Sequence, residues 1–415
     1  MPAGGNRVLA ILLLAYIFNF VDRQILSVLQ IPIKAELGLT DGQVGLMGGL
    51  AFALLYSGLG VPVAWLADRT DRVRIIAVSL GVWSAFTALC GTAQGFWHLF
   101  LSRMGVGVGE AGGVAPCYAL ISDYFPPERR ARALAIFSLG IPIGSALGVF
   151  FGGWLASSID WRSAFMIIGG AGLLIVPLVL FGIRDPGRGR FDAQAAETAP
   201  PPFSVVIRTL AAKPSFWLLS FGAASGSVLG YGLAFWLPPF LTRSLGLRLI
   251  DISWFYGSVA LVGGTAGVWL GGVFGDRLAR IRPGGYPLIP AICFLVAAPV
   301  YAAGLFASSL TMAWIMFTIG TALGLAWLGP VIAAVQHIVP PSMRATASAS
   351  FLLINNLLGI GFGIWFLGFM SERMTASMGD EALRWSMFYG LGFYLLSACL
   401  YGLAAWRLGR DWHRG

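Results

Sequence analysis

Charge is scarce in this sequence. Only 11% of its 415 residues are Asp, Glu, Lys or Arg, and its mean hydropathy is +0.80, whereas a soluble domain usually carries about 25% charged residues. A water-soluble domain is therefore excluded as the main body of the chain. The four cysteines lie far apart and show neither CxxC nor Cys/His ligand spacing. Neither a disulfide framework nor a metal site is predicted.

Catalytic signatures are also missing. The sequence contains no HExxH, no GxSxG and no hydrophilic segment long enough for a catalytic domain. We therefore predict that the protein is not an enzyme and needs no cofactor. An integral membrane enzyme is kept only as an alternative from another functional class.

One glycine run fits a nucleotide-binding pattern, because Gly107–Gly112 reads G-x-G-x-x-G. That pattern binds a dinucleotide only where it follows a strand and opens a helix, whereas here it lies inside an apolar run. Gly105, Gly109 and Gly113 are spaced four residues apart, the small-xxx-small pattern of closely packed membrane helices. We interpret the run as a packing surface.

Apolar runs of membrane-spanning length make up most of the chain, each near the roughly 20 residues that a helix needs to cross the hydrocarbon core. The first run contains Asp22 and Arg23 and has no small-residue cleavage site, so it is predicted to be a span rather than a signal peptide. The predicted fold is an all-α integral membrane protein with twelve transmembrane helices, at residues 8–32, 43–67, 75–95, 97–124, 130–157, 161–183, 215–242, 251–275, 286–307, 310–338, 343–370 and 384–408.

The net charge of +9 is distributed unevenly. Basic residues gather in alternate loops, within residues 69–74, 129–132, 184–213, 277–282, 344 and 407–414, and the loops between them hold few. This positive-inside pattern predicts a multi-pass protein of the cell (inner) membrane with both termini in the cytoplasm. The charge is thus a topology signal, and nucleic acid is not expected as a partner.

The chain contains an internal repeat. The segment "WLADRTDRVR" resembles the later segment "GVFGDRLARIR", 208 residues further along the chain. The segment "YFPPERRARALAIF" resembles "IVPPSMRATASASF", 214 residues further along. A polar Pro- and Gly-rich run between the halves is typical of a linker. We expect a six-helix bundle at 1–183, a cytoplasmic linker at 184–214 and a second six-helix bundle at 215–415, related by pseudo-symmetry. A duplication of this kind indicates a transporter with a site at midplane between the halves, and we expect it to act as a monomer.

Four charged residues lie well inside predicted spans: Asp22, Arg23, Arg103 and Glu110. A charge in hydrocarbon is costly unless it is paired or faces water, so each is a functional candidate. Arg103 and Glu110 are seven residues apart and share a helix face, and Asp22 falls between them in depth. We expect Arg103 to lie between the two carboxylates.

This cluster predicts proton coupling. Burial and a nearby arginine shift a carboxyl pKa in opposite directions, so such groups can bind and release protons as their surroundings change. Asp22 and Glu110 are predicted to carry the proton, and Arg23 and Arg103 to be charge partners or to bind a substrate anion. The alternative is a static buried ion pair that fixes helix packing.

The second half lacks this set of charges. With the repeat offset of 214, Arg103 aligns with Phe317, and Glu110 aligns with Gly324. We therefore expect ion coupling in the first half and substrate binding shared by both halves.

The segment Asp68-Arg69-Thr70-Asp71-Arg72-Val73-Arg74 resembles the signature of the major facilitator superfamily, although Ala64 and Asp71 stand where glycines are usual. The resemblance implies that Asp68 pairs with and caps neighbouring helices at their cytoplasmic ends. Asp123 is expected as an additional carboxylate for Arg69 or Arg72. The predicted cytoplasmic gate consists of Asp68, Arg69, Arg72 and Asp123.

The runs "FNFVDRQILSVL", "RMGVGVGEAG" and "SDYFPPERRARALAIFSLGIPIGSALG" are similar to the Spinster transporters. This resemblance implies proton-linked movement of a lysophospholipid or sphingoid amphiphile, with protons and membrane lipid as further partners. The four intramembrane charges match the polar functional positions of that family. A major-facilitator transporter of small organic anions or drugs remains the alternative.

Further cavity candidates are aromatic or polar residues inside predicted spans. Each could contact substrate, but each could equally pack against lipid or hydrogen-bond to another helix. They are Tyr118, Ser225, Tyr231, Trp327 and Asn355.

Overall fold

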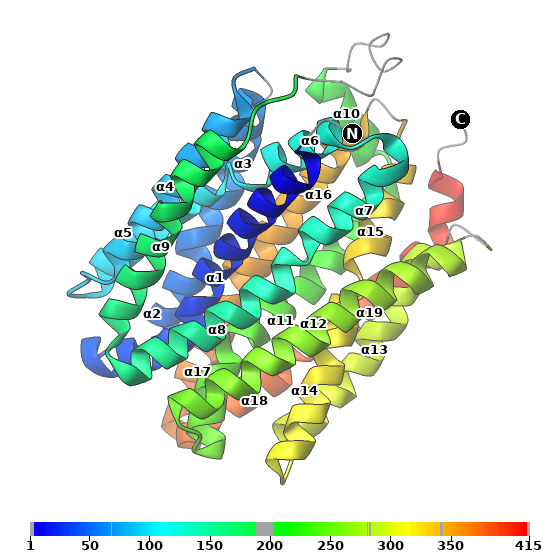
Figure 1. Cartoon of the computed structure of the whole chain (residues 1–415). Coiled ribbons are helices and arrows are strands. Elements are labelled where there is room, and N and C mark those ends of the chain that lie inside the picture. Colours follow the sequence, from blue (N-terminus) through cyan, green and yellow to red (C-terminus); the bar gives the residue numbers. More distant parts are fainter. Residues whose placement is uncertain are drawn as a thin grey trace. The chain divides into compact units, whose positions relative to one another are not determined.

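The computed structural model describes residues 4–67, 69–187, 202–279, 281, 284–340 and 343–412, and these are helical with no strand among them (Figure 1). Eleven helical segments within them are long and apolar enough to cross a membrane. The last segment, Thr346–Asp411, has 66 residues, far more than the roughly 20 that one crossing needs. It turns back at Gly379, whose φ is 56°, and the Ser386 hydroxyl donates to the Leu367 carbonyl across the turn, at 2.7 Å. It therefore contains both of the last two predicted spans.

The chain divides into two compact units. Unit 1 comprises residues 1–197 and 237–257, and unit 2 comprises residues 198–236 and 258–415. The wholly first-unit elements are α1 (Gly5–Leu37), α2 (Asp41–Gly45), the π-helix η1 (Leu46–Leu50), α3 (Ala51–Ala67), α4 (Arg72–Cys90), α5 (Phe96–Glu110), α6 (Val114–Tyr124), α7 (Pro127–Ser138), α8 (Gly140–Ser158) and α9 (Trp161–Gly182).

Two helices cross the boundary between the units, α11 (Pro214–Leu245) and α12 (Leu249–Ala279). The wholly second-unit elements are α10 (Phe203–Ala211), α13 (Gly285–Leu305), α14 (Leu310–Leu325), α15 (Leu328–His337), α16 (Arg344–Asn356), the π-helix η3 (Leu357–Phe362), α17 (Gly363–Met378), the short 3₁₀ turn η4 (Gly379–Glu381), α18 (Ala382–Gly390) and α19 (Gly392–Asp411). Residues 188–201 of the predicted linker lie outside the described residues, and α10 lies within the remainder.

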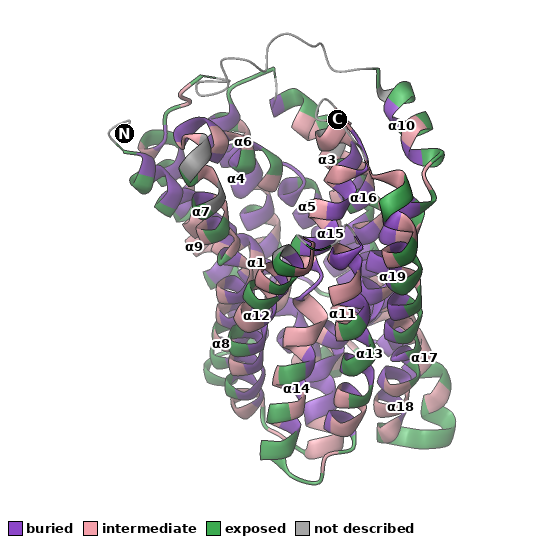
Figure 2. Cartoon of the chain, turned by 90° about the vertical axis from the view of Figure 1, so that its right-hand side faces the viewer, coloured by how far each residue is buried: buried purple, intermediate pink, exposed green. Residues whose placement is uncertain are grey.

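Several helices carry exposed large apolar side chains, and Figure 2 shows the exposed positions along the helices in green. On α9, Phe181 is 85% exposed and Leu174 is 79% exposed, and on α19 Trp406 is 70% exposed. Many exposed large apolar side chains are unfavourable in water and favourable against lipid tails. The surface thus agrees with the apolar composition of the sequence.

The glycine run lies where α5 packs between α4 and α3. A Cβ on Gly109 would lie 2.4 Å from the Trp83 main-chain nitrogen, and one on Gly105 would lie 2.3 Å from the Phe86 ring, both on α4. A Cβ on Gly107 would lie 2.6 Å from the Phe52 carbonyl oxygen on α3. These contacts confirm that the run is a packing surface. They also bring the charged positions of α5 close to neighbouring helices.

We expect Gly109→Ala to destabilise the protein. An added methyl in a closely packed site costs about 1–3 kcal/mol, which exceeds the gain of up to about 1 kcal/mol from replacing glycine within a helix. The matched control is Gly170→Ala on α9, where a Cβ meets no atom within 4 Å, so this variant should be as stable as the parent or more so. Thermal unfolding followed by intrinsic fluorescence measures both. Equal midpoints for the two variants would contradict the packing argument.

Candidate functional site

A buried ion pair joins α1 and α5 within unit 1. The Arg23 Nε donates to Glu110 Oε2 at 2.5 Å. The Glu110 side chain is fully buried, and that of Arg23 is 13% exposed. Because an isolated ion is strongly disfavoured in an apolar interior, removing either partner from a buried pair typically costs about 3–5 kcal/mol. The pair therefore fixes how α1 and α5 are rotated relative to each other.

Arg103 lies beside this ion pair and contacts the backbone of α1. Its Nη1 is 3.5 Å from the main-chain oxygen of Asp22, and it forms no ion pair with either carboxylate in the described part of the chain. Arg23, not Arg103, forms the ion pair with Glu110, while Arg103 stays within electrostatic range of both carboxylates. The seven-residue spacing of Arg103 and Glu110 predicts that they share a helix face. It does not predict how α1 is rotated against that face.

Aromatic rings surround the Arg23 guanidinium. Its Cζ lies 4.4 Å from the ring centre of Tyr56, 5.0 Å from that of Phe52 and 5.2 Å from that of Phe20. Cation–π contacts of this kind are worth more once the cation is desolvated. The rings thus allow an arginine to remain charged where little water reaches it. Phe52 also lies 5.6 Å from the Arg103 Cζ, so one ring contacts both arginines.

Asp22 lies in a cluster of buried polar atoms that have few protein partners. Asp22 is 1% exposed, and neither of its carboxylate oxygens has a hydrogen bond of good geometry to a described residue. Trp83 and Thr87 on α4 border it, and Asn19 borders Glu110. A buried polar group without a partner costs about 1–3 kcal/mol, and such groups call for a functional explanation. The arrangement can change its protonation and its pairing together.

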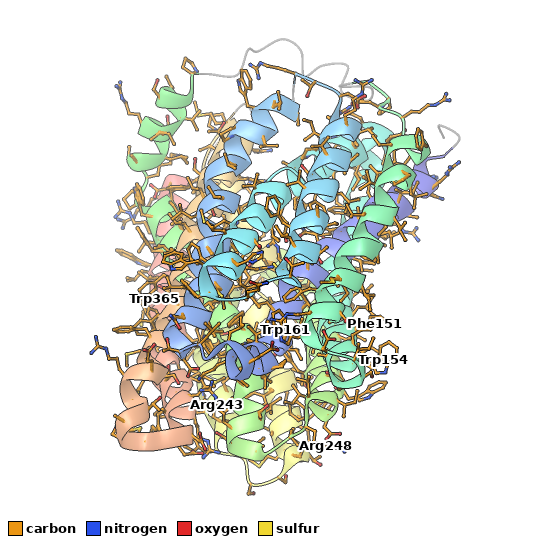
Figure 3. All side chains as sticks on the ribbon, turned by 90° about the vertical axis from the view of Figure 1, so that its left-hand side faces the viewer. Phe151, Trp154, Trp161, Arg243, Arg248 and Trp365 are labelled. Carbon is orange, nitrogen blue, oxygen red and sulfur yellow. The ribbon has the colours of Figure 1, made fainter. Side chains whose placement is uncertain are left out.

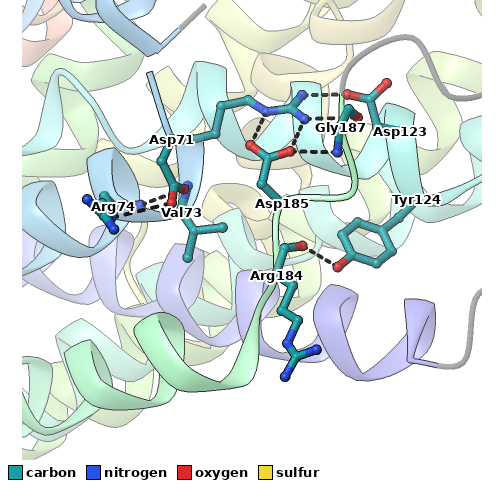
Figure 4. A network of polar contacts seen from close by, with 9 residues as sticks. Asp71, Val73, Arg74, Asp123, Tyr124, Arg184, Asp185 and Gly187 are labelled. Carbon is teal, nitrogen blue, oxygen red and sulfur yellow. Dashed lines mark hydrogen bonds and ion pairs between the residues drawn. The ribbon is translucent and has the colours of Figure 1, made fainter. Parts of the chain in front are cut away.

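A second polar network joins α4, α6 and the segment after α9 (Figure 4). The Arg72 Nη1 donates to Asp123 Oδ2 at 2.5 Å, and its Nε and Nη2 donate to the two oxygens of Asp185 at 2.9 and 2.5 Å. Of the two arginines considered for Asp123, it is Arg72 that pairs with it. The Arg72 side chain is 3% exposed, so two carboxylates compensate one buried cation.

Asp185 is a partner that the sequence reasoning missed. It lies in the run "RDPGRGR" directly after the sixth span, where it reads as part of a linker. The available signal was its position as the first acidic residue beyond a span end that is rich in arginine. The hydrogen bond from Arg72 is the main cause of a lowered pKa for the Asp185 carboxyl group.

The other two predicted gate residues behave differently. Arg69 donates to the Trp65 carbonyl at 3.2 Å and stacks over the Trp65 ring with its Cζ 3.9 Å from the ring centre. It therefore interacts with its own helix segment rather than with Asp123. Asp68 lies outside the described residues.

The cavity candidates are spread over both units. In unit 1, Tyr118 is 38% exposed and meets Phe137 edge-on. In unit 2, Asn355 is 2% exposed and accepts a hydrogen bond from Ser227 at 2.8 Å. The Ser227 hydroxyl thus links α11 to α16, and the predicted cavity residue Ser225 is half-buried on α11.

The remaining two candidates both lie in unit 2. Trp327 is 5% exposed and packs edge-on against Phe351. Tyr231 is half-buried and lies close to Gly359 of η3.

Unit 2 places aromatic side chains at or beside the positions aligned with Arg103 and Glu110. Phe317, the counterpart of Arg103, packs against Tyr301. A Cβ on Gly324, the counterpart of Glu110, would lie 2.9 Å from the Tyr394 hydroxyl oxygen. Tyr301 is 3.2 Å from the Thr321 hydroxyl. The second half therefore fills this region with phenol rings and hydroxyl groups, which hydrogen-bond without carrying charge.

We expect the stabilising effect of Asp185 to depend on pH. Because the folded-state pKa of Asp185 is lowered, its contribution is complete above the ordinary aspartate pKa of about 3.9 and is lost as pH falls towards the lowered value. The difference in unfolding temperature between the parent and Asp185→Asn should be constant from about pH 8 to 5 and shrink below about pH 4.

The control for this series is Asp251→Asn, which removes an exposed carboxylate paired with Arg248 at i,i+3. Exposed pairs contribute little, so its unfolding temperature should stay near that of the parent at each pH. If the difference in unfolding temperature between the parent and Asp185→Asn is as large at pH 3 as at pH 7, the ionised Asp185 carboxylate does not contribute to stability.

Comparison with known proteins gives consistent matches. The profile of the Major Facilitator Superfamily matches residues 12–364. An "MFS-type efflux pump" of Mycolicibacterium smegmatis is 34% identical over 99% of this chain and 95% of its own length. "Protein spinster homolog 1" of Mus musculus is 30% identical over 96% of this chain and 79% of its own length.

Solved structures agree with these matches. Two crystal structures of a bacterial homologue of the human lysosomal transporter Spinster are similar over 100% of this chain and 99% of theirs. The inward-facing and occupied form has a TM-score of 0.86 at 31% identity, and the inward-facing and unoccupied form has 0.87 at 32%. The fold, the glycine packing and the sequence matches lead to one assignment. This chain is a multi-pass membrane protein that belongs to the Major Facilitator Superfamily of transporters and, within it, to the Spinster-type proteins.

Proposed function

We propose that this protein is a proton-linked, alternating-access transporter of an amphipathic, lipid-like substrate of the lysophospholipid or sphingoid type. The observation that carries the proposal is the buried Arg23–Glu110 ion pair beside the buried Asp22 carboxylate and Arg103. Structural ion pairs can also be buried, but a second carboxylate with few protein hydrogen bonds is costly to retain without a function.

The proton step follows from the charge balance. Asp22 and Glu110 together offset Arg23 and Arg103, so the four-residue cluster is neutral when both carboxyl groups are ionised. Proton binding to either carboxyl group leaves one positive charge uncompensated. In a low-dielectric environment this change favours either re-pairing of an arginine or binding of an anionic group. Either response gives the differential interaction that a conformational change requires.

The lipid-like substrate rests on two supports. The Spinster resemblance implies a lysolipid or sphingoid cargo, and the aromatic rings around Arg23 suit an acyl chain that lies beside a charged group. The second candidate, export of small organic anions or drugs, is favoured by the efflux pump of Mycolicibacterium smegmatis, the relative with 34% identity. In that case an arginine would bind the anionic group of the cargo.

We further propose that the protein resides in the inner membrane as a monomer with both termini in the cytoplasm. The support is the basic clustering in alternate loops. The Arg72–Asp123–Asp185 network then lies at the cytoplasmic end of unit 1. There it would steady one conformation, as the family signature at residues 68–74 implies.

We expect Asp22→Asn and Glu110→Gln to slow pH-driven transport about tenfold or more, a change of about 1.4 kcal/mol, because each removes a buried carboxyl group that can take up the transported proton. The assay is flux of a labelled lysophospholipid into protein-only liposomes, with and without an imposed pH gradient. The control is Asp251→Asn, an exposed carboxylate outside the cluster, which should transport at the parent rate.

Two further readouts separate the alternatives. If the ion pair is static, Glu110→Gln lowers the unfolding temperature but leaves the pH dependence of flux intact. Parent-like flux for both cluster variants across pH 5 to 8 would refute proton coupling. A labelled small organic anion that moves faster than the lysophospholipid in the same liposomes would favour the second candidate.

A further inference from the structure

A third charged cluster lies in unit 1 at the C-terminal end of α1. Asp41, at the start of α2, is 3% exposed and accepts from Arg243 Nη1 and Nη2, one on each oxygen, both at 2.6 Å. Lys34 near the end of α1 also donates to Asp41, at 2.5 Å. One buried carboxylate therefore binds two cations, one from α1 and one from the final turns of α11. Figure 3 shows Arg243 and Arg248 towards the same end of the molecule.

These cations line a cavity. Its volume is about 310 Å³, and Lys34 and Arg243 face it from two helices. Ile31, Ala35 and Pro239 give it an apolar wall. Lys34 is eleven residues from Arg23 along α1, or roughly 16 Å at 1.5 Å per residue. The cavity is thus separate from the Arg23–Glu110 cluster.

The cavity carries a net positive charge. Asp41 offsets only one of the two cations, so the three-residue cluster has a formal charge of +1. Asp41 accepts from one of the three N–H donors of Lys34, and from the Nη atoms but not the Nε of Arg243. The two side chains remain 34% and 21% exposed. Spare donors, positive charge and access are what an anionic ligand requires.

We propose that this cavity binds the anionic headgroup of a single-chain amphiphile, a phosphate group held by Lys34 and Arg243. The apolar wall would take the first carbons of the tail. A role of this site in transport rests on the function proposed above, whereas headgroup binding can be measured without transport. The same phosphate chemistry is present in free inorganic phosphate, and the experiment distinguishes the two sources.

The geometry also predicts a competition. The phosphate and Asp41 use donors on the same two side chains. A bound headgroup therefore weakens the ion pairs by which Asp41 on α2 holds α1 and α11. Removing the charge of Asp41 should therefore strengthen headgroup binding, whereas removing Lys34 should weaken it. Opposite effects from two partners of one ion pair are not expected of a purely structural salt bridge.

The test is a binding titration on the full-length protein in nanodiscs of phosphatidylcholine. The ligands are lysophosphatidylglycerol, which carries one net negative charge, and lysophosphatidylcholine, a zwitterion with the same acyl chain. We expect lysophosphatidylglycerol to bind more tightly and Lys34→Gln to weaken its binding about tenfold, the effect of losing one charge-assisted hydrogen bond. Binding of lysophosphatidylcholine should change less. Asp41→Asn should strengthen binding of lysophosphatidylglycerol severalfold.

Two further variants make the result specific. Arg248→Gln removes a cation that pairs with the exposed Asp251 outside the cavity and should leave both affinities unchanged. Ala35→Glu adds a carboxylate to the cavity wall at an exposed position and should abolish the preference for the anionic lipid. Because Ala35 takes no part in the ion pairs, this variant tests the proposal even if Lys34→Gln does not fold.

Three results would overturn the proposal. The first is that the parent binds the two lipids with equal affinity. The second is that Lys34→Gln and Ala35→Glu fold and bind with the affinities of the parent. The third is that inorganic phosphate binds as tightly as the lipid. The last result would identify a free-anion site instead. Since the titration needs no gradient or flux, its failure is distinguishable from a failure of the proposed transport function.

Discussion

The high cost of a charge in hydrocarbon is the constraint on which this structure depends. Glu110 is fully buried and Arg23 nearly so, and each is tolerable there only because the other lies 2.5 Å away. The pair fixes how α1 and α5 are rotated, and the aromatic rings over Arg23 replace part of the water that the guanidinium has lost. Asp22 and Arg103 are buried beside the pair, and several of their polar atoms have no hydrogen-bond partner among the described residues. One cluster thus holds a tightly paired carboxylate and a second carboxylate with few protein partners, and the proposed proton step rests on this difference.

Close helix packing makes the ion pair geometrically possible. Gly105 and Gly109 let α5 approach α4 to distances at which a Cβ would clash, and Gly107 does the same towards α3. Without hydrophobic attraction between helices in lipid, such contact is gained through van der Waals packing of small residues. The glycine run and Glu110 thus act together, since the glycines set the distance at which the charge meets its partner.

The two halves use related positions in different ways. Where unit 1 carries Arg103 and Glu110, unit 2 carries Phe317 and Gly324, with the Tyr394 hydroxyl close to the glycine. Phenol rings keep hydrogen-bonding groups at this depth without the desolvation cost of a charge. A duplicated scaffold can therefore keep its packing while only one copy retains the buried charges at these positions.

Hydropathy and loop charge by themselves determined the helical membrane fold, the span positions and the four intramembrane charges, because these properties are local along the chain. Only tertiary structure decided the pairings. Arg23 rather than Arg103 meets Glu110 across 87 residues, Asp185 joins Arg72 across 113, and Arg243 reaches Asp41 across 202. Each pairing depends on the rotation and axial offset of helices distant in sequence. Helix periodicity fixes which residues share a face, but it does not fix which helix that face meets.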